Sequence, residues 1–366
     1  MIVERLAALQ TRLVDASLDG VALVPGPNLA YLTGFPIHTS ERPVVAFLDR
    51  MQAPVLLLPG LEAGRAASVF GDQVRVVSYT DEAGPADAFS QAAELLSLAG
   101  KRYAVEYLHM RVLELRALEQ AAPSARFVSL ESNLAGLRMA KDAGEVAAMR
   151  RAIAITEEAL SLLISEPVAG LTERQIALRL SQQMTQLGAD GVAFIIVVAG
   201  PNSADPHAGP SDRPVQSGDF LTIDFGAVKD GYPADLTRTF VVGEPTEKQR
   251  EMYDAVLRAN KAGRQAVGPG VHAEDIDRAA RQEIEAAGYG EFFIHRTGHG
   301  LGLEVHEPPY IVEGNSQPVV QGAVFTIEPG VYLPGFGGVR IEDDVQVTAD
   351  GADCLTSFSR ELMSLA

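Results

Sequence analysis

The sequence predicts an α+β protein of two domains, and three observations lead to that prediction. At 366 residues the chain is longer than one ordinary domain. Its first third alternates short apolar runs with helical patterns, which is typical of an α/β layer domain. The remainder alternates longer helices with strands joined by glycine-rich turns, which predicts an antiparallel sheet covered by helices. We therefore expect a smaller N-terminal domain at 1–131 and a second domain at 132–366.

The N-terminal domain is expected to begin with an amphipathic helix, because Leu6, Leu9 and Leu13 recur at helical spacing. Apolar runs bounded by turn-forming residues are predicted to be strands at 20–26, 44–49, 53–60, 74–79, 103–106 and 125–130. Helical patterns lie between several of these runs, at 62–69, 86–98 and 109–121. Residues 131–140 are expected to form a connector to the second domain.

The second domain is expected to contain helices at about 141–165, 172–188, 246–267 and 273–288. Two of these helices begin at a capping box, in which a threonine and a glutamine three residues later satisfy backbone N–H groups of the first turn. The two pairs are Thr172 with Gln175 and Thr246 with Gln249. Gly188 follows the last periodic residue of one helix and is expected to end it.

Composition excludes several classes of function. The formal net charge of −18 argues against a nucleic acid or an anionic membrane as partner, because both attract an excess of lysine and arginine. The single cysteine, Cys354, rules out an internal disulfide and fits a reducing compartment. The N-terminus lacks the apolar core of a signal peptide, and the longest apolar run, 192–200, is too short to span a membrane. We therefore expect a cytoplasmic protein.

Four acids and one histidine stand in short strand-like segments of the C-terminal half: Asp224, Asp235, His299, Glu328 and Glu342. Carboxylates gathered in a fold repel one another, and their burial without partners is very costly, so such a cluster predicts bound cations. Oxygen-rich coordination with one nitrogen suits Mn²⁺, Co²⁺, Fe²⁺ or Zn²⁺. The number of acids favours two ions and, with them, metal-assisted hydrolysis.

Two predicted hairpins bring these acids together in pairs. Asp224 and Asp235 flank an Asp-Gly turn, and pairing residues whose numbers sum to about 459 places them nearly opposite each other. Like charges opposite each other destabilise a sheet, so a cation is expected between them. Glu328 and Glu342 flank the turn L-P-G-F-G-G in the same way, and His299 arrives from the segment G-H-G-L-G. A metal pair about 3.5–4 Å apart could share a hydroxide nucleophile between these ligands.

The motifs around these residues resemble a known family. They are T-I-D-F-G with D-G-Y-P-A-D-L-T-R-T-F, then T-G-H-G-L-G-L-E-V-H-E-P-P, T-I-E-P-G-V-Y and G-V-R-I-E-D-D. This series resembles the metallopeptidase family of Xaa-Pro dipeptidases (prolidases), aminopeptidase P and methionine aminopeptidases. The resemblance covers about residue 132 to the end and implies the "pita-bread" fold, a curved antiparallel sheet covered by helices. The N-terminal domain is similar to that of the prolidase and aminopeptidase P branch.

The resemblance implies a role for each of the five ligands. Asp235 and Glu342 would bridge both metal ions, Asp224 would bind one ion, and His299 with Glu328 would bind the other. Two divalent ions per subunit are therefore expected, with Mn²⁺ first and Co²⁺ or Zn²⁺ as alternatives. Glu328 is also the candidate proton shuttle, because the leaving prolyl nitrogen must gain a proton.

The resemblance also implies roles for four further residues. His207 would contact substrate, and His306 would hydrogen-bond the scissile carbonyl oxygen. His295 would belong to the substrate pocket, with a structural hydrogen bond as its alternative role. Arg340 would order the pocket or meet a substrate carboxylate, or would instead support an acid ligand.

Hydrolysis of the bond before proline in Xaa-Pro dipeptides, by a hydroxide that bridges the metals, is the activity that the resemblance favours. Aminopeptidase P, which acts on longer peptides with proline at the second position, is the alternative. A non-catalytic peptide-binding module on the same fold is a third interpretation, against which the complete ligand set argues. We expect a homodimer, in which the loop at 28–42 of a neighbouring subunit could block longer peptides or could simply be solvated.

Overall fold

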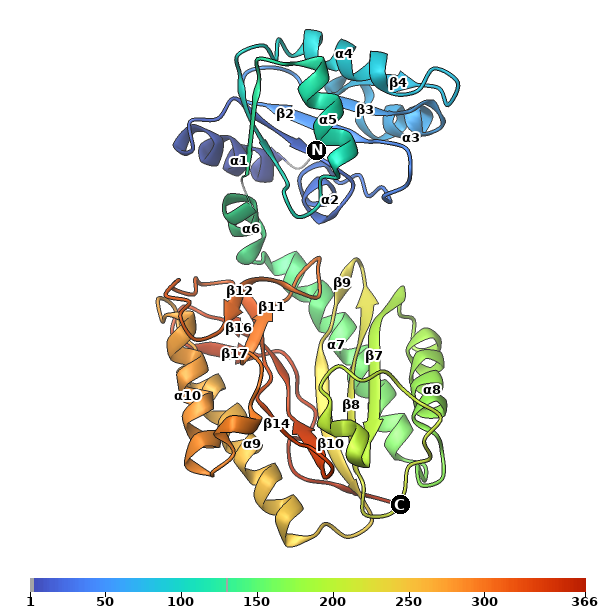
Figure 1. Cartoon of the computed structure of the whole chain (residues 1–366), viewed down its shortest axis with the longest axis vertical. Coiled ribbons are helices and arrows are strands. Elements are labelled where there is room, and N and C mark those ends of the chain that lie inside the picture. The colour runs from blue at the N-terminus through green and yellow to red at the C-terminus, as the bar shows by residue number, and fades with distance from the viewer. Residues whose placement is uncertain (1–2, 130) are drawn as a thin grey trace. The chain divides into compact units, whose positions relative to one another are not determined.

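The computed structural model describes residues 3–129 and 131–366 of a chain that divides into two compact units, Met1–Arg138 and Met139–Ala366 (Figure 1). Both units combine helices with sheets, which confirms the predicted α+β architecture. Within the described ranges, no helix has the length and apolar content that crossing a membrane requires.

The N-terminal unit contains one mixed sheet with the strand order β4-β3-β2-β1-β5-β6. Its strands are β1 (Gly20–Leu23), β2 (Val45–Asp49), β3 (Val55–Pro59), β4 (Arg75–Tyr79), β5 (Arg102–Val105) and β6 (Arg126–Ser129). Strand β2 runs antiparallel to both β1 and β3, and the other neighbours are parallel. Each predicted strand of this domain is therefore present.

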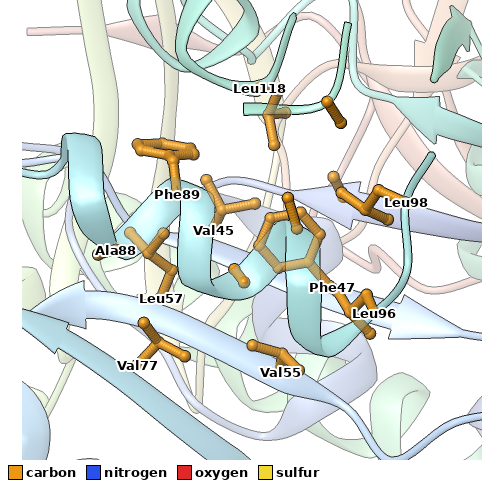
Figure 2. Close-up of a cluster of buried hydrophobic side chains, with 14 of the residues drawn as sticks. Val45, Phe47, Val55, Leu57, Val77, Ala88, Phe89, Leu96, Leu98 and Leu118 are labelled. Carbon is orange, nitrogen blue, oxygen red and sulfur yellow. The ribbon is translucent and has the colours of Figure 1, made fainter. Parts of the chain in front are cut away.

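The helices described for this unit are α1 (Val3–Asp15), α2 (Pro27–Thr33), α3 (Gly60–Phe70), α4 (Ala86–Leu95), α5 (Val112–Ala121) and α6 (Glu131–Met139). The expected connector at 131–140 is largely helical, because most of that segment forms α6. Apolar side chains of the sheet pack against α4 and α5, as Figure 2 shows for Phe47 and Leu57 beneath Phe89 and Leu118. This packing gives the unit a hydrophobic core of its own.

The C-terminal unit is built on two larger sheets and a separate hairpin. The first sheet has the order β18 (Ser364–Leu365), β10 (Leu236–Val242), β8 (Phe220–Lys229), β7 (Gly191–Ala199), with β9 (Tyr232–Pro233) beside β8. The second has the order β12 (Glu307–Ile311), β11 (Gly298–Gly300), β13 (Val324–Ile327), β16 (Asp343–Val347), β17 (Ala352–Cys354). The hairpin joins β14 (Gly330–Leu333) to β15 (Gly337–Arg340).

The helices that cover these sheets are α7 (Ala143–Ile164), α8 (Glu173–Gln186), α9 (Glu247–Ala266) and α10 (Ala273–Ala286). Figure 1 shows α7 and α8 beside β7 and β8, and α9 with α10 along the other side of the unit. Both predicted capping boxes are present, at Thr172 and Thr246, and a third begins α7 at Asp142. The four helices lie close to their predicted ranges. Local hydrogen bonds of the capping boxes specify the starts of α7, α8 and α9, whereas α10 begins after His272 without a side-chain cap.

The hairpin that carries the two aspartates pairs in a different register from the predicted one. Asp224 lies opposite Thr237 rather than Asp235, so the paired numbers sum to 461. The turn explains the shift, because Asp230 and Gly231 both have positive φ, 51° and 81°, as the central residues of a two-residue hairpin turn do. Residues two apart on a strand share a face. The two aspartates therefore lie diagonally, not directly, across the hairpin.

The hairpin that carries the two glutamates keeps one register along its length. Ile327 lies opposite Asp343 where β13 pairs with β16, and Gly330 lies opposite Arg340 where β14 pairs with β15. The paired numbers have the same sum in both ladders. Residues 328 and 342 therefore lie opposite each other between the β13/β16 ladder and the β14/β15 ladder.

Candidate active site

The C-terminal unit contains a pocket of about 620 Å³ where its sheets meet. Its polar lining consists of His207, Asp224, Asp235, His295, Arg296, His299, His306, Glu328, Arg340 and Glu342. An apolar wall is formed by residues such as Phe194, Ile196 and Val305. Each of the nine site residues expected from the sequence lies on this one pocket, and Arg296 joins them.

Three of the expected ligands converge most closely. Asp235, His299 and Glu342 each place one ligand atom within 4.8 Å of the others, and all three are buried. His299 Nε2 lies 3.2 Å from a Glu328 oxygen and 3.7 Å from an Asp235 oxygen. His299 Nδ1 lies 3.2 Å from the Gly300 carbonyl oxygen. Because a carbonyl can only accept, Nδ1 carries the hydrogen and Nε2 presents its lone pair to the acids.

One hydroxyl group and one guanidinium group each hold one of the acids in place through a hydrogen bond. The Thr237 hydroxyl donates to Glu342 Oε2 at 2.5 Å, and the Glu342 amide donates to the Thr237 carbonyl at 3.1 Å, which joins the two hairpins. Arg340 donates to Asp224 Oδ2 at 2.6 Å. The other oxygen of Asp224, Oδ1, is buried without a hydrogen-bond partner among the described residues. An orphaned carboxylate oxygen in this position is one that a cation would satisfy.

The electrostatics of the cluster call for positive charge. Burial, and then repulsion from neighbouring acids, raises the pKa of both Asp235 and Glu342 well above the usual range. Burial also raises the pKa of Glu328 to about 7, although Arg340 opposes the shift. Burial, followed by the neighbouring His306, lowers the pKa of His299 to about 3, so that the imidazole is neutral. Neutral imidazole and closely spaced carboxylates are the donor set that divalent transition ions take, so these residues fit such ions.

A relay of hydrogen bonds connects the acids to a second histidine. Arg340 donates to the Tyr332 hydroxyl at 2.7 Å, and that hydroxyl lies 2.9 Å from His295 Nε2. His295 Nδ1 lies 2.7 Å from the Arg296 carbonyl, so it carries the hydrogen and Nε2 accepts from Tyr332. Burial, and then the charge of Arg340, lowers the pKa of His295 to about 4. Tyr332 was missed in the sequence, where V-Y-L gave only the pattern of an ordinary strand.

The remaining two histidines are more open to solvent. His306 is exposed and its ring centroid lies 4.0 Å from that of His299, with the rings at 66°. His207 is also exposed, and its backbone amide donates to the Asp205 carboxylate. Both rings therefore reach the pocket from its solvent side, where a ligand can approach them.

Behind the acids lies a buried ion pair that sequence reasoning also missed. Arg238, with 1% of its surface exposed, donates to the backbone carbonyls of Thr237 and Glu342 and to the carboxylate of Asp343. Arg360 donates to the same carboxylate. A signal was present in the sequence, because an arginine in the middle of an apolar strand is rarely buried without a carboxylate partner.

Comparison with known proteins assigns the chain to a family. A family model described as Metallopeptidase family M24 matches residues 147–349, and one described as Creatinase/Prolidase N-terminal domain matches residues 5–140. The Xaa-Pro dipeptidase of Lactobacillus delbrueckii subsp. lactis is 38% identical over 366 residues, which cover 98% of each protein.

Two solved structures are similar over nearly the whole chain. Dipeptidase PepE from Mycobacterium ulcerans is 40% identical with a TM-score of 0.93, covering 99% of this chain and 97% of that one. A prolidase from Thermococcus sibiricus is 36% identical with a TM-score of 0.94, covering 100% of this chain and 99% of that one. Since the matching M24 model spans more than half of its length, the chain belongs to metallopeptidase family M24.

Proposed function

We propose that the protein is an Xaa-Pro dipeptidase that uses two divalent ions, with Mn²⁺ the first candidate and Co²⁺ or Zn²⁺ as alternatives. The observation that carries the proposal is the buried convergence of Asp235, His299 and Glu342 within 4.8 Å, beside two further acids. The names of the similar proteins, Xaa-Pro dipeptidase and prolidase, support the choice of substrate.

The ligand assignment is the one that the family resemblance implies, and the convergence of Asp235, His299 and Glu342 supports it. Asp235 and Glu342 would bind both ions, Asp224 one ion, and His299 with Glu328 the other. Ions held there would supply a hydroxide nucleophile at neutral pH and polarise the scissile carbonyl group. Thr237 and Arg340 would keep the carboxylate oxygens aligned through the hydrogen bonds described above.

The histidines and Glu328 would handle the substrate and its protons. His306, exposed on the solvent side of the pocket, would donate a hydrogen bond to the oxygen of the scissile carbonyl as negative charge develops there. His207 and His295 would contact the peptide. Glu328 would take a proton from the attacking water and deliver it to the leaving nitrogen. That transfer is essential, because the nitrogen must gain a hydrogen when its bond to the carbonyl carbon breaks.

The test combines product analysis with metal analysis. The protein, supplied in turn with Mn²⁺, Co²⁺ and Zn²⁺, is offered Ala-Pro, Ala-Pro-Ala and Met-Ala-Ser, and the released amino acids are separated. We expect hydrolysis of Ala-Pro above the other two, with about two ions per chain. Asp235→Ala and Glu342→Ala should lose ions and activity together. Preference for Ala-Pro-Ala would instead identify an aminopeptidase P, and full activity in either variant would refute the ligand assignment.

We further propose that the protein is a cytoplasmic homodimer. Its single cysteine and acidic composition support a reducing, aqueous compartment. Light scattering coupled to gel filtration measures the assembly, and a mass near the 39.0 kDa of one chain would contradict the dimer.

A further inference from the structure

Two arginines line the pocket, and their charges are used differently. Arg340 is buried and ion-paired with Asp224 at 2.6 Å. It also donates to the hydroxyls of Tyr332 and Thr237. Its positive charge is therefore already balanced by a carboxylate, and its plane is held by three different partners. Such a residue is suited to support the acid cluster rather than to receive a ligand.

Arg296 has the opposite character. Its guanidinium lies over the ring of Tyr310, 4.5 Å from the ring centroid, and the side chain is half-buried on the wall of the pocket. Over the described part of the chain it makes no side-chain hydrogen bond and no ion pair. Stacking on an aromatic face holds the guanidinium plane while leaving its N–H groups free along the edge. The guanidinium of Arg296 is therefore an oriented cation on the pocket wall whose N–H groups can donate to a ligand.

The position of Arg296 places this cation near the reacting groups. It precedes His299 by three residues and lines the same pocket as His306. A ligand group bound by Arg296 would thus lie in the same pocket as the histidine proposed to contact the scissile carbonyl.

The charge balance of the loaded site favours an anion at this position. Two divalent ions would carry four positive charges against four carboxylates and one hydroxide, so that, with the charges of Arg296 and Arg340, one positive charge is left over. Arg340 still has Asp224 beside it, whereas Arg296 has no acid partner among the described residues. An Xaa-Pro dipeptide carries a carboxylate directly on its prolyl residue, whereas in a longer peptide an amide stands at that position.

We propose that Arg296 binds the C-terminal carboxylate of the dipeptide and thereby selects dipeptides over longer peptides, whereas Arg340 is a positioning residue for Asp224. The inference rests on the proposed dipeptidase activity. A planar guanidinium can grip a carboxylate with two parallel hydrogen bonds, which gives both affinity and orientation. Fixing the prolyl carboxylate in this way also fixes the preceding peptide bond relative to the acid cluster.

The test compares Ala-Pro with Ala-Pro-amide, which differ only in the group that Arg296 would bind. We expect Arg296→Gln to raise the KM for Ala-Pro by about 10- to 100-fold, because hydrogen bonds between charged groups are lost. The same variant should change the KM for Ala-Pro-amide by less than about threefold. Arg296→Lys should recover part of the loss, since it keeps the charge without the paired geometry. Arg174→Gln, which removes an exposed side chain paired with Asp212, is the matched control and should change neither KM.

A second readout does not require turnover. Isothermal titration of the metal-loaded protein with free proline and with prolinamide measures the carboxylate contribution to binding directly. Arg296→Gln should weaken proline binding and leave prolinamide binding and metal content unchanged. Equal losses for the acid and the amide would overturn the role of Arg296. Absence of Ala-Pro hydrolysis by the unaltered protein would instead refute the dipeptidase activity, while the titration would still test the carboxylate site.

Discussion

Replacement of the buried arginine behind the acids provides the most demanding test of how this site is built. Arg238 is 1% exposed and bonds at once to the backbone of Thr237, to the backbone of Glu342 and to the Asp343 carboxylate. Arg238→Met keeps most of the side-chain volume and removes every one of these bonds. The change therefore isolates the guanidinium as the link between the two hairpins that carry the acids.

The expected magnitude follows from the surroundings of Asp343. Burial would raise the pKa of this carboxyl, but the charges and hydrogen bonds of Arg238 and Arg360 hold it at about 2. Removing one partner from a buried ion pair costs about 3–5 kcal/mol. Arg360 and Arg264 remain beside Asp343, so we expect the lower part of that range. Because Arg238 also holds the backbone of Glu342, metal affinity should fall by about 10- to 100-fold.

Urea unfolding followed by hydrogen exchange of the β10 and β16 amides measures the free energy of unfolding of the C-terminal unit by itself. Calorimetric titration with Mn²⁺ measures the metal affinity. Arg150→Met is the matched control. This change breaks an ion pair between the side chains of Arg150 and Asp353, which are 46% and 49% exposed. It should lower the free energy of unfolding by only about 0–1 kcal/mol. If Arg238→Met unfolded as easily as the control and bound Mn²⁺ normally, the guanidinium would not support the site as argued.

Two more predictions concern charge and space in the acid cluster. Chelation should lower the free energy of unfolding more at pH 8 than at pH 5, because the raised pKa of Glu328 makes the metal-free fold lose stability as pH rises from about 4.5 to about 7. Calorimetry with and without chelator measures this, and a pH-independent difference would contradict it. Gly226→Ala should lower both the melting temperature and metal content, because its Cβ would lie 1.8 Å from the Ala234 carbonyl oxygen. Gly351→Ala, whose Cβ meets nothing within 4 Å, is the control, and equal melting temperatures would refute the steric argument.

The comparison of sequence and structure shows which signals are local. The capping boxes at Thr172 and Thr246 specified their helices because both partners lie within one turn. The Asp-Gly turn also carried enough information, since positive φ at both residues implies a two-residue turn; the register was missed by placing its centre too early. Helix α6 was missed because its short segment has no comparable start signal.

The residues of the candidate site also divide into those that local motifs identify and those that only the structure identifies. The motifs that flank the tight turns located the four acids and His299, and the family resemblance implied the other three histidines. The resemblance also made Arg340 a candidate either for substrate binding or for support of an acid ligand. The structure places Arg340 against Asp224 and leaves Arg296 as the arginine of the pocket without an acid partner among the described residues.

The sequence by itself therefore determined the chemistry of this protein: the types of ligand, their order and the hairpins that carry them. Only the tertiary structure decided which charges balance one another. Arg238 reaches Glu342 across 104 positions and Arg340 reaches Asp224 across 116, and no local pattern records such pairs. The physical reason is that hydrogen bonds at turns and helix ends form between near neighbours, whereas buried charges are paired by whatever the completed fold brings within reach.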